Sequence, residues 1–231
     1  MPWCAGPLLG LNIGLMLLKG GGLVIHNNCQ LAQDWEPQRA KYPCTVEVKR
    51  DGFRALAFSD HSINRSGHWQ IISRRGNVLN NTLAITSELK YMLNVPEEVV
   101  LDGEVFAGDF KLTASITRCN GGHPATERLH FFVFDGLTLD EWKNEDCDLT
   151  LQQRKARLSQ WFSNAKRVPH VHLVQWATVQ TEEQLFTRAN SVVQMGHEGV
   201  LVKKAQSTYK FRRSFDWLKL TPRNIYWKRQ A

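Results

Sequence analysis

Short β-rich segments recur along this chain with few helical segments between them, and this mixture most limits the folds that it can adopt. Apolar and polar side chains alternate within residues 45–49 and 216–220, which is typical of antiparallel strands with one buried face. The other predicted strands are residues 53–59, 69–73, 99–106, 130–135, 171–175 and 200–203. Because these strands do not alternate one by one with helices, we predict an α+β fold rather than a doubly wound parallel sheet.

Three helices are predicted between these strands. They span residues 82–93, 151–162 and 182–195. The last two start with a Thr-x-x-Gln sequence, whose threonine, Thr150 or Thr181, directly precedes the helix. The side chain of this threonine caps the first backbone amides of the helix. Gly196 is placed to end the third helix, since glycine readily adopts the left-handed conformation found at helix C-termini.

The composition is that of a globular chain with a basic excess. Of the 231 residues, 29 are Lys or Arg and 22 are Asp or Glu, so the formal net charge is +7. Such a balance favours an anionic partner, for example a nucleic acid or a nucleotide. Hydrophobic residues make up 42% of the chain, which excludes an intrinsically disordered protein. No apolar stretch reaches the ~20 residues that a membrane-spanning helix needs, so we expect no membrane contact.

The cysteines and the N-terminus bear on the cellular compartment. The five cysteines are an odd number and include no C-x-x-C pair, so we expect neither a disulfide framework nor a structural zinc site. Residues 1–28 form an apolar, glycine-rich extension of unclear role, and no Lys or Arg precedes its apolar run, unlike in a secretory signal. We expect a protein of the reducing cytoplasm, in a bacterial or phage-infected cell, and keep export through an N-terminal leader as the alternative.

The most informative motif is Lys-x-Asp-Gly-x-Arg, which begins at Lys49 and ends at Arg54. Alternation along the preceding strand places Glu47 and Lys49 on the same face. Asp51-Gly52 is a strong turn signal, so we predict a β-hairpin whose return strand follows directly. Lys49 then lies at the end of a strand, where a rigid sheet commonly holds catalytic groups.

Further motifs follow in order along the chain. They are Ser73-Arg74-Arg75-Gly76, Asp102-Gly103-Glu104, Phe134-Asp135, Glu198-Gly199-Val200-Leu201-Val202-Lys203 and Trp217-Leu218-Lys219. Together with the lysine motif, this series resembles the covalent nucleotidyltransferase superfamily, which comprises ATP-dependent DNA ligases, RNA ligases and mRNA capping guanylyltransferases. The resemblance runs from about residue 31 to residue 222 and is greatest to the adenylation domain of small phage-type DNA ligases.

The resemblance implies an enzyme that uses ATP and Mg²⁺ and acts on nicked duplex DNA. Lys49 is expected to attack the α-phosphate of ATP and form lysyl-AMP. The AMP then passes to the 5′-phosphate at the nick before the phosphodiester bond forms. The pKa of a free lysine is about 10.4, so nearby cations and partial burial are needed to favour the neutral amine. A ring of positive side chains with a divalent ion suits phosphoryl transfer, which depends on positioning and charge neutralisation.

The other site residues take their roles from the same resemblance. The expected nucleotide contacts are Glu47, Arg54, Arg74, Glu104, Phe134, Lys203 and Lys219. The expected Mg²⁺ ligands are Glu104 and Glu198, because carboxylates are hard oxygen ligands. Phe134 is expected to stack on the base, and Phe132 lies on the same face of its strand. Each of these residues alone also fits a structural role, as a solvated strand end or a core side chain, and it is their joint occurrence that favours function.

Two features depart from the family pattern. Thr221 stands where the last motif, Lys-x-Lys, has its second lysine, so one positive charge is missing. Ligases and capping enzymes also continue into an OB-fold domain, whereas nine residues follow Pro222. We therefore expect residues 29–222 to be the adenylation domain and residues 223–231 to start a hinge, with the OB-fold domain absent. Nick sealing is then expected to need such a domain in trans.

Two other functions remain open at this point. Within the superfamily, the alternative is an RNA ligase or an mRNA capping guanylyltransferase, and labelled GTP or nicked RNA distinguishes them. The alternative of another class is a catalytically impaired nucleic-acid-binding remnant, which Thr221 favours. In each case we expect a monomer.

Overall fold

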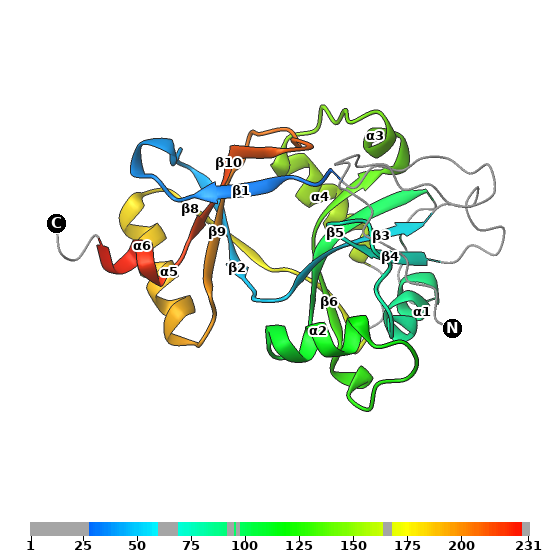
Figure 1. Ribbon diagram of the computed structural model, residues 1–231. Coiled ribbons are helices and arrows are strands. Elements are labelled where there is room, and N and C mark those ends of the chain that lie inside the picture. The colour runs from blue at the N-terminus through cyan, green and yellow to red at the C-terminus, as the bar shows by residue number, and fades with distance from the viewer. Residues whose placement is uncertain (1–27, 60–68, 92–94, 96–97, 164–167, 228–231) are drawn as a thin grey trace, which may run out of the picture.

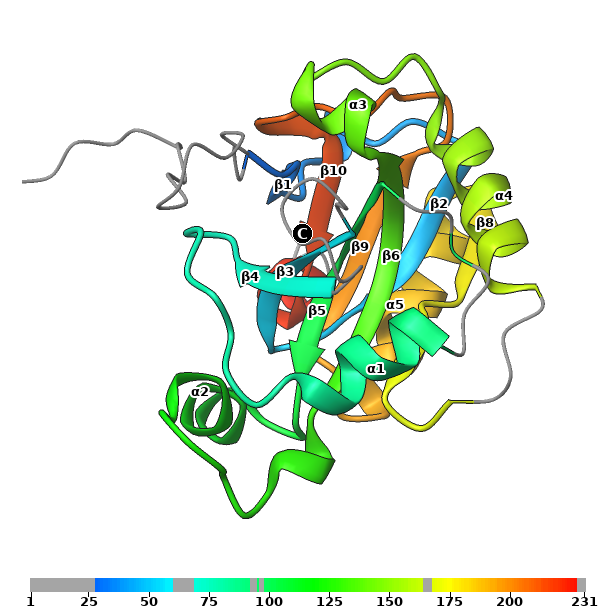
Figure 2. The same cartoon turned by 90° about the vertical axis from the view of Figure 1, so that its right-hand side faces the viewer.

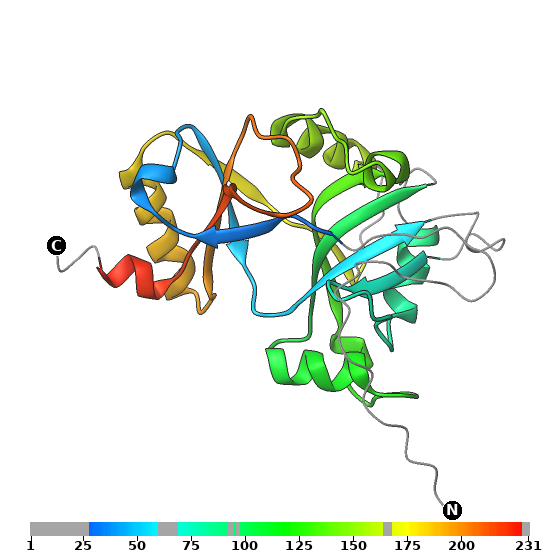
Figure 3. The same cartoon turned by 45° about the horizontal axis from the view of Figure 1, so that its top comes forward.

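The computed structural model describes residues 28–59, 69–91, 95, 98–163 and 168–227. Within these residues the strands form two five-stranded sheets that lie side by side (Figures 1 and 3). The N-terminal extension expected at residues 1–28 lies outside the described part, apart from Asn28. None of the described helices is long and apolar enough to cross a membrane.

The first sheet has the strand order β1-β10-β9-β2-β8. Its strands are β1 (Leu31–Asp34), β2 (Cys44–Lys49), β8 (Trp176–Val179), β9 (Gly199–Lys204) and β10 (Arg213–Leu220). All neighbouring strands are antiparallel except β1 and β10, which are parallel. Both edges of β2 are therefore paired, and this strand carries Glu47 and Lys49.

The second sheet has the order β4-β3-β5-β6-β7. Its strands are β3 (Phe53–Ser59), β4 (Trp69–Ser73), β5 (Val99–Phe106), β6 (His130–Thr138) and β7 (Val171–Leu173). Only β6 and β7 are parallel. These five strands follow one another along the chain, whereas the first sheet is built from the segments on either side of them.

The helices pack against the two sheets. They are α1 (Leu83–Tyr91), α2 (Phe110–Arg118), α3 (Leu139–Lys143), α4 (Leu151–Phe162), α5 (Glu182–Gln194) and α6 (Pro222–Trp227), with short 3-10 turns η1 (Pro37–Arg39) and η2 (Thr126–Arg128). Helices α5 and α6 flank the first sheet, and α1 lies in front of the second sheet in Figure 2. The Thr150 and Gln153 side chains form the predicted capping box, and Thr181 accepts a hydrogen bond from the Gln184 amide.

Three groups of buried apolar side chains hold these layers together. One group joins the outer face of the second sheet to α1, α2 and α4, and includes Leu89, Ile116 and Leu158. Another joins the first sheet to α5, through Leu185 and Ala189 on the helix. The third lies between the two sheets and contains Leu56, Val100, Phe134, Trp142 and Trp217. Burial of these side chains fixes the positions of the strand ends that face the space between the sheets.

The prediction of a β-hairpin at Asp51-Gly52 is wrong, because β2 and β3 belong to different sheets. Each strand already has a hydrogen-bonded neighbour on both edges, so the two cannot pair with each other. Gly52 is needed for a close approach instead: a Cβ there would lie 2.4 Å from the carbonyl oxygen of Val105. The turn signal marks the point at which the chain passes from one sheet to the other.

The predicted strand at residues 171–175 is shorter in the structure, and the strand that follows it was not predicted. Residues up to Leu173 form β7, and β8 begins at Trp176 in the first sheet. The amide of Val174 bonds to the carbonyl of Val133, which ends the pairing with β6. The apolar pattern is continuous, but the chain changes sheets within it.

Candidate functional site

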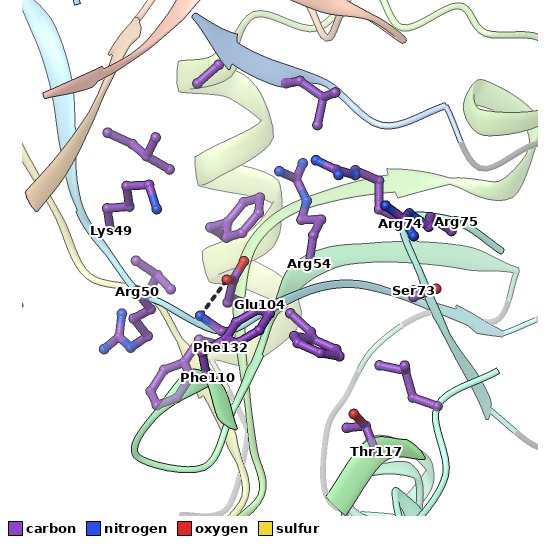
Figure 4. Close-up of a pocket in the computed structure, with 18 of the residues that line it drawn as sticks. Lys49, Arg50, Arg54, Ser73, Arg74, Arg75, Glu104, Phe110, Thr117 and Phe132 are labelled. Carbon is purple, nitrogen blue, oxygen red and sulfur yellow. Dashed lines mark hydrogen bonds between the residues drawn. The ribbon is translucent and has the colours of Figure 1, made fainter. Parts of the chain in front are cut away.

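A cleft of about 790 Å³ lies where the two sheets meet. Its walls include side chains from β2 and β10 of the first sheet and from β3, β5 and β6 of the second. The residues predicted as site residues that line it are Lys49, Arg54, Arg74, Glu104, Phe134 and Lys219. Figure 4 shows Lys49 on one side of this cleft and Arg54 and Arg74 on the other. Strands that are far apart in the sequence thus bring most of the predicted side chains together.

Lys49 occupies the last position of β2 and is 23% exposed. Its backbone pairs with Gly199, so Glu198 lies beside it, and the ammonium group forms an ion pair with the Glu198 carboxylate. Gly199 permits this arrangement: its φ is +143°, and a Cβ would lie 2.3 Å from the carbonyl oxygen of Leu220. The close packing of β9 against the end of β10 therefore places Glu198 next to the amine.

Arg54 is held rigidly on the opposite wall. Its Nε and Nη2 atoms donate to the two carboxylate oxygens of Asp102, at 2.6 and 2.5 Å, and Nη2 also donates to the carbonyl of Gln30. Asp102 is fully buried and accepts a further hydrogen bond from the Tyr209 hydroxyl at 2.7 Å. This two-point pairing fixes the plane of the guanidinium group at the cleft wall.

Glu104 lies on β5 directly opposite Arg54 in the strand register. Its Oε1 atom accepts a hydrogen bond from the Gly52 amide at 3.0 Å, as the dashed line in Figure 4 shows. Burial raises the pKa of Glu104 to about 7, against the opposing effects of Arg54, Lys49 and the Gly52 amide. Near neutral pH the side chain is therefore divided between its charged and neutral forms.

Glu47 and Lys203 lie behind the cleft wall rather than among its lining residues. Glu47 is only 2% exposed and forms ion pairs with the ammonium groups of Lys203 and Lys155. Burial alone would raise the pKa of Glu47, but the two lysines outweigh it and keep the pKa below its usual value. The structure thus brings two predicted residues together with Lys155, a residue of α4 that the sequence did not single out.

Both aromatic residues considered on β6 line the cleft. Phe134 is 5% exposed and packs edge-on against Trp217, with ring centroids 5.9 Å apart. Phe132 is more accessible, and the guanidinium carbon of Arg50 lies 3.8 Å from its ring centroid. Figure 4 shows Phe132 and Arg50 close together at the cleft.

Lys219 and Thr221, the two positions of the last motif, lie at the end of β10. Lys219 lines the cleft and forms an ion pair with Asp34 at 3.2 Å. The Thr221 hydroxyl donates to the side-chain oxygen of Asn224 at 3.1 Å, and Thr221 is not among the lining residues. Within the described ranges, no three His, Cys, Asp or Glu side chains are grouped so as to hold a metal ion.

Sequence reasoning missed several cleft residues. They are Arg50, Phe110, Arg118 and Arg213, together with the apolar residues around them. Arg118 and Phe110 belong to α2, which was not predicted. Asp109 in front of this helix is a typical N-cap residue, and its side chain accepts a hydrogen bond from the Leu112 amide. Arginines that line a cleft of this kind are suited to phosphate groups.

Comparison with known proteins agrees with this fold. The sequence profile of the family described as "ATP dependent DNA ligase domain" matches residues 33–221. The DNA ligase of African swine fever virus (isolate Warthog/Namibia/Wart80/1980) is 26% identical over 165 residues, which cover 71% of this chain and 37% of the viral protein. The chain thus spans about two fifths of the length of that relative.

Solved structures show the same fold. The ATP-dependent DNA ligase from bacteriophage T7, in complex with ATP, superposes with a TM-score of 0.68 at 18% identity and covers 86% of this chain and 69% of its own. The Chlorella virus DNA ligase-adenylate superposes with a TM-score of 0.62 at 20% identity, with coverage of 84% and 68%. The predicted α+β fold with mainly antiparallel sheets is therefore confirmed.

Proposed function

Because the chain belongs to the family of ATP-dependent DNA ligase domains, we propose that it catalyses ligase-type nucleotidyl transfer, with the amine of Lys49 as the nucleophile. The observation that carries the proposal is the position of this amine. It lies at the wall of a cleft whose other side holds Arg54 and Glu104, and it contacts the Glu198 carboxylate. In this proposal residues 29–222 are the adenylation domain.

The proposed step forms one bond and breaks another. The Lys49 nitrogen bonds to the α-phosphorus of ATP, the bond from that phosphorus to the bridging oxygen breaks, and pyrophosphate leaves. The amine must lose a proton, and Glu198 is the acceptor already in contact with it. Arg54, fixed by Asp102, and Lys219 supply positive charge for the phosphates. The AMP then passes to the 5′-phosphate of nicked DNA, and the 3′-hydroxyl displaces it.

Glu104, which lines the cleft, and Glu198, which contacts Lys49 at its wall, fit a magnesium ion. Mg²⁺ is usually held by one or two protein carboxylates together with substrate phosphates, so Glu104 and Glu198 form a sufficient protein share of its ligands. The two carboxylates lie near the same amine, because Glu198 contacts Lys49 and Glu104 interacts electrostatically with both Lys49 and Glu198. When bound, the ion neutralises charge on the phosphates during transfer.

Magnesium affinity is expected to fall as the pH drops below about 7. Burial raises the pKa of Glu104 to about 7, so the carboxylate that binds a cation is present above this value and is lost below it. Mg²⁺ is titrated into the chain in the presence of a nonhydrolysable ATP analogue. The half-saturating Mg²⁺ concentration should therefore be several-fold higher at pH 6 than at pH 8. Glu104→Gln should remove most of this pH dependence. Equal pH dependence in both proteins would contradict the prediction.

Incubation of the chain with ATP labelled at the α-phosphate and with Mg²⁺ tests the proposed function. We expect a covalent, acid-labile adduct on the peptide that contains Lys49, with release of pyrophosphate. ATP labelled at the γ-phosphate is the control and should give no labelled protein. Labelling by GTP instead of ATP would favour a capping guanylyltransferase, and transfer to nicked RNA rather than nicked DNA would favour an RNA ligase. Absence of any adduct, with DNA binding intact, would favour a non-catalytic nucleic-acid-binding protein.

Nicked duplex DNA is the proposed partner. The arginines at the cleft support this, because Arg50, Arg74, Arg75, Arg118 and Arg213 all line it. Contacts to the phosphate backbone gain free energy by releasing counterions, and added salt reduces this gain, so binding is expected to fall steeply with ionic strength. The cytoplasm of a bacterial or phage-infected cell is the proposed location, in keeping with the four described cysteines, which are all free thiols.

A further inference from the structure

A buried carboxylate behind the cleft is shared between two lysines. Glu47, on β2, is 2% exposed, and each of its carboxylate oxygens faces a different ammonium group. Oε2 lies 2.7 Å from the Nζ of Lys203, and Oε1 forms an ion pair with Lys155. The group therefore carries one negative and two positive charges in a site that is closed to water.

Lys155 is also held by contacts other than its ion pair with Glu47. It projects from α4, is 3% exposed, and donates a hydrogen bond to the backbone carbonyl of Phe134 at 2.6 Å. Its Nζ also lies 4.8 Å from the ring centroid of Trp176 on β8. Lys155 thus joins a helix, the second sheet and the first sheet at one point, and it is not among the residues that line the cleft.

Lys203 is placed differently. It is fully buried on β9, and the only oxygen described within ion-pair distance of its Nζ belongs to Glu47. The Nζ lies 3.9 Å from the Trp217 ring centroid and 4.5 Å from that of Phe134, and Phe134 lines the cleft. Lys203 is therefore separated from the cleft by one aromatic ring, and its ammonium must leave Glu47 before it can touch a phosphate there.

The charges explain why this departure is possible. Removing the sole partner of a buried carboxylate leaves an uncompensated charge, which is strongly unfavourable. Glu47 has a second partner that stays in place, so loss of the Lys203 contact leaves it neutralised. The Lys155 hydrogen bond to Phe134 also keeps that ammonium in position while Lys203 moves.

We propose that Lys155 is a positioning residue for nucleotidyl transfer, which remains as the standing counter-ion of Glu47 so that Lys203 can turn from Glu47 to the nucleotide phosphate. The inference rests on the proposed function and adds a residue that does not itself contact the nucleotide.

The titration of Lys203 agrees with this arrangement. Burial, together with repulsion from Lys155, lowers the pKa of Lys203 to about 8, against the opposing attraction of Glu47 and Asp135. The Asp135 carboxylate is itself engaged by Arg154, at 2.9 and 3.0 Å. Lys203 is thus held less firmly than a lysine with a carboxylate of its own.

A double-mutant cycle on Lys155 and Glu47 tests the proposal. Lys155→Gln removes the charge but keeps a donor for the Phe134 carbonyl. We expect it to slow adduct formation at saturating ATP about tenfold, with little change in ATP affinity, because Lys203 becomes the sole partner of Glu47. In a chain that already carries Glu47→Gln, the same substitution should change the rate less than about twofold, since no charge remains to be neutralised. Lys155→Arg, which keeps the charge, should retain transfer close to that of the original chain.

Arg157→Met is the matched control. Arg157 lies on the same helix and likewise joins a carboxylate, that of Glu141, and a β6 carbonyl, that of Gly136. It should lower the melting temperature without slowing adduct formation. Thermal unfolding of every variant identifies one that does not fold, and Lys155→Met then replaces Lys155→Gln in the cycle.

The outcomes separate the inference from the proposed function. If the original chain forms no adduct, the proposed function fails and this inference fails with it. If the original chain forms the adduct, the inference alone is overturned in either of two cases. In one, Lys155→Gln does not slow adduct formation at all. In the other, it slows the reaction by the same factor in the Glu47→Gln chain as in the original chain, and such additive effects would mean that Lys155 acts through packing alone.

Discussion

Replacing Lys49 by alanine should abolish formation of the covalent adduct, down to the background of the assay. The nitrogen that bonds to the α-phosphorus is then absent, and the described cleft offers no other lysine in contact with Glu198. The fold should persist, because an ion pair whose side chains are 23% and 35% exposed contributes about 1 kcal/mol or less to stability. Intact-protein mass spectrometry after incubation with ATP and Mg²⁺ measures the adduct directly.

Lys204→Ala provides the matched control for this substitution. Lys204 follows Lys203 on β9 and forms a similarly exposed ion pair with Asp216 at 2.7 Å, but it does not line the cleft. Adduct formation should continue in this variant. An adduct that survives Lys49→Ala, at whatever residue it is then found, would disprove the assignment of the nucleophile.

Of the substitutions considered, Arg154→Met should lower the free energy of unfolding the most. The Arg154 side chain and its partner Asp135 are both fully buried, with two hydrogen bonds at 2.9 and 3.0 Å, and Arg154 also donates to the Leu149 carbonyl at 2.8 Å. Removing one member of such a pair leaves a buried charge without a partner and typically costs about 3–5 kcal/mol. At about 2–4 °C per kcal/mol for a domain of this size, the melting temperature should fall by roughly 10 °C.

Arg157→Met is expected to have a much smaller effect on thermal unfolding. Its ion pair with Glu141 is formed by side chains that are 18% and 20% exposed, and a pair with access to water contributes about 1 kcal/mol or less. Differential scanning calorimetry compares the two variants at the same pH and salt. Equal shifts in melting temperature would show that burial does not set the strength of the Arg154–Asp135 pair.

Strands that coincide with apolar, β-rich segments could be predicted from the sequence. Residues 53–59, 69–73 and 99–106 are strands with the predicted limits, and α4 also has the predicted limits because Thr150 and Gln153 mark its start. Prediction was less successful where the cause is remote. The four residues of β1 form a strand because β10, about 180 residues later, pairs with them. No local pattern carries that information.

Helices α2, α3 and α6 were all missed, although local signals mark the first two. Asp109 caps α2, and Thr138 with Glu141 forms a complete capping box at the start of α3. Helix α3 is only five residues long and follows a strand whose apolar pattern runs up to it, which conceals the change of period. The change of sheet at Asp51 was missed for another reason: a turn signal gives the position of a bend but not the sheet that the next strand joins.

In the candidate site, too, motif residues could be predicted from the sequence, whereas residues placed by remote packing could not. The ordered motifs pointed to Lys49, Arg54, Glu104 and Lys219, and the structure places these side chains around one cleft. Their chemical roles remain predictions. Lys155 could not be found from the sequence, since a lysine on a helix of mixed composition is usually a solvated residue. Its contact with Glu47 depends on how α4 packs against β6 and on the burial of β2.

The order of the strands along the chain makes each wall of the cleft a separate hydrogen-bonded sheet. The whole second sheet, from β3 to β7, is a single insertion between β2 and β8 of the first sheet. Among the described strands, the backbone therefore passes from one sheet to the other only at residues 50–52 and 174–175. Both crossings border the cleft, through Arg50, Gly52 and Val174. These two crossings and the buried contact of Phe134 with Trp217 therefore set the distance between the two walls, while the hydrogen-bonded ladders hold each wall together.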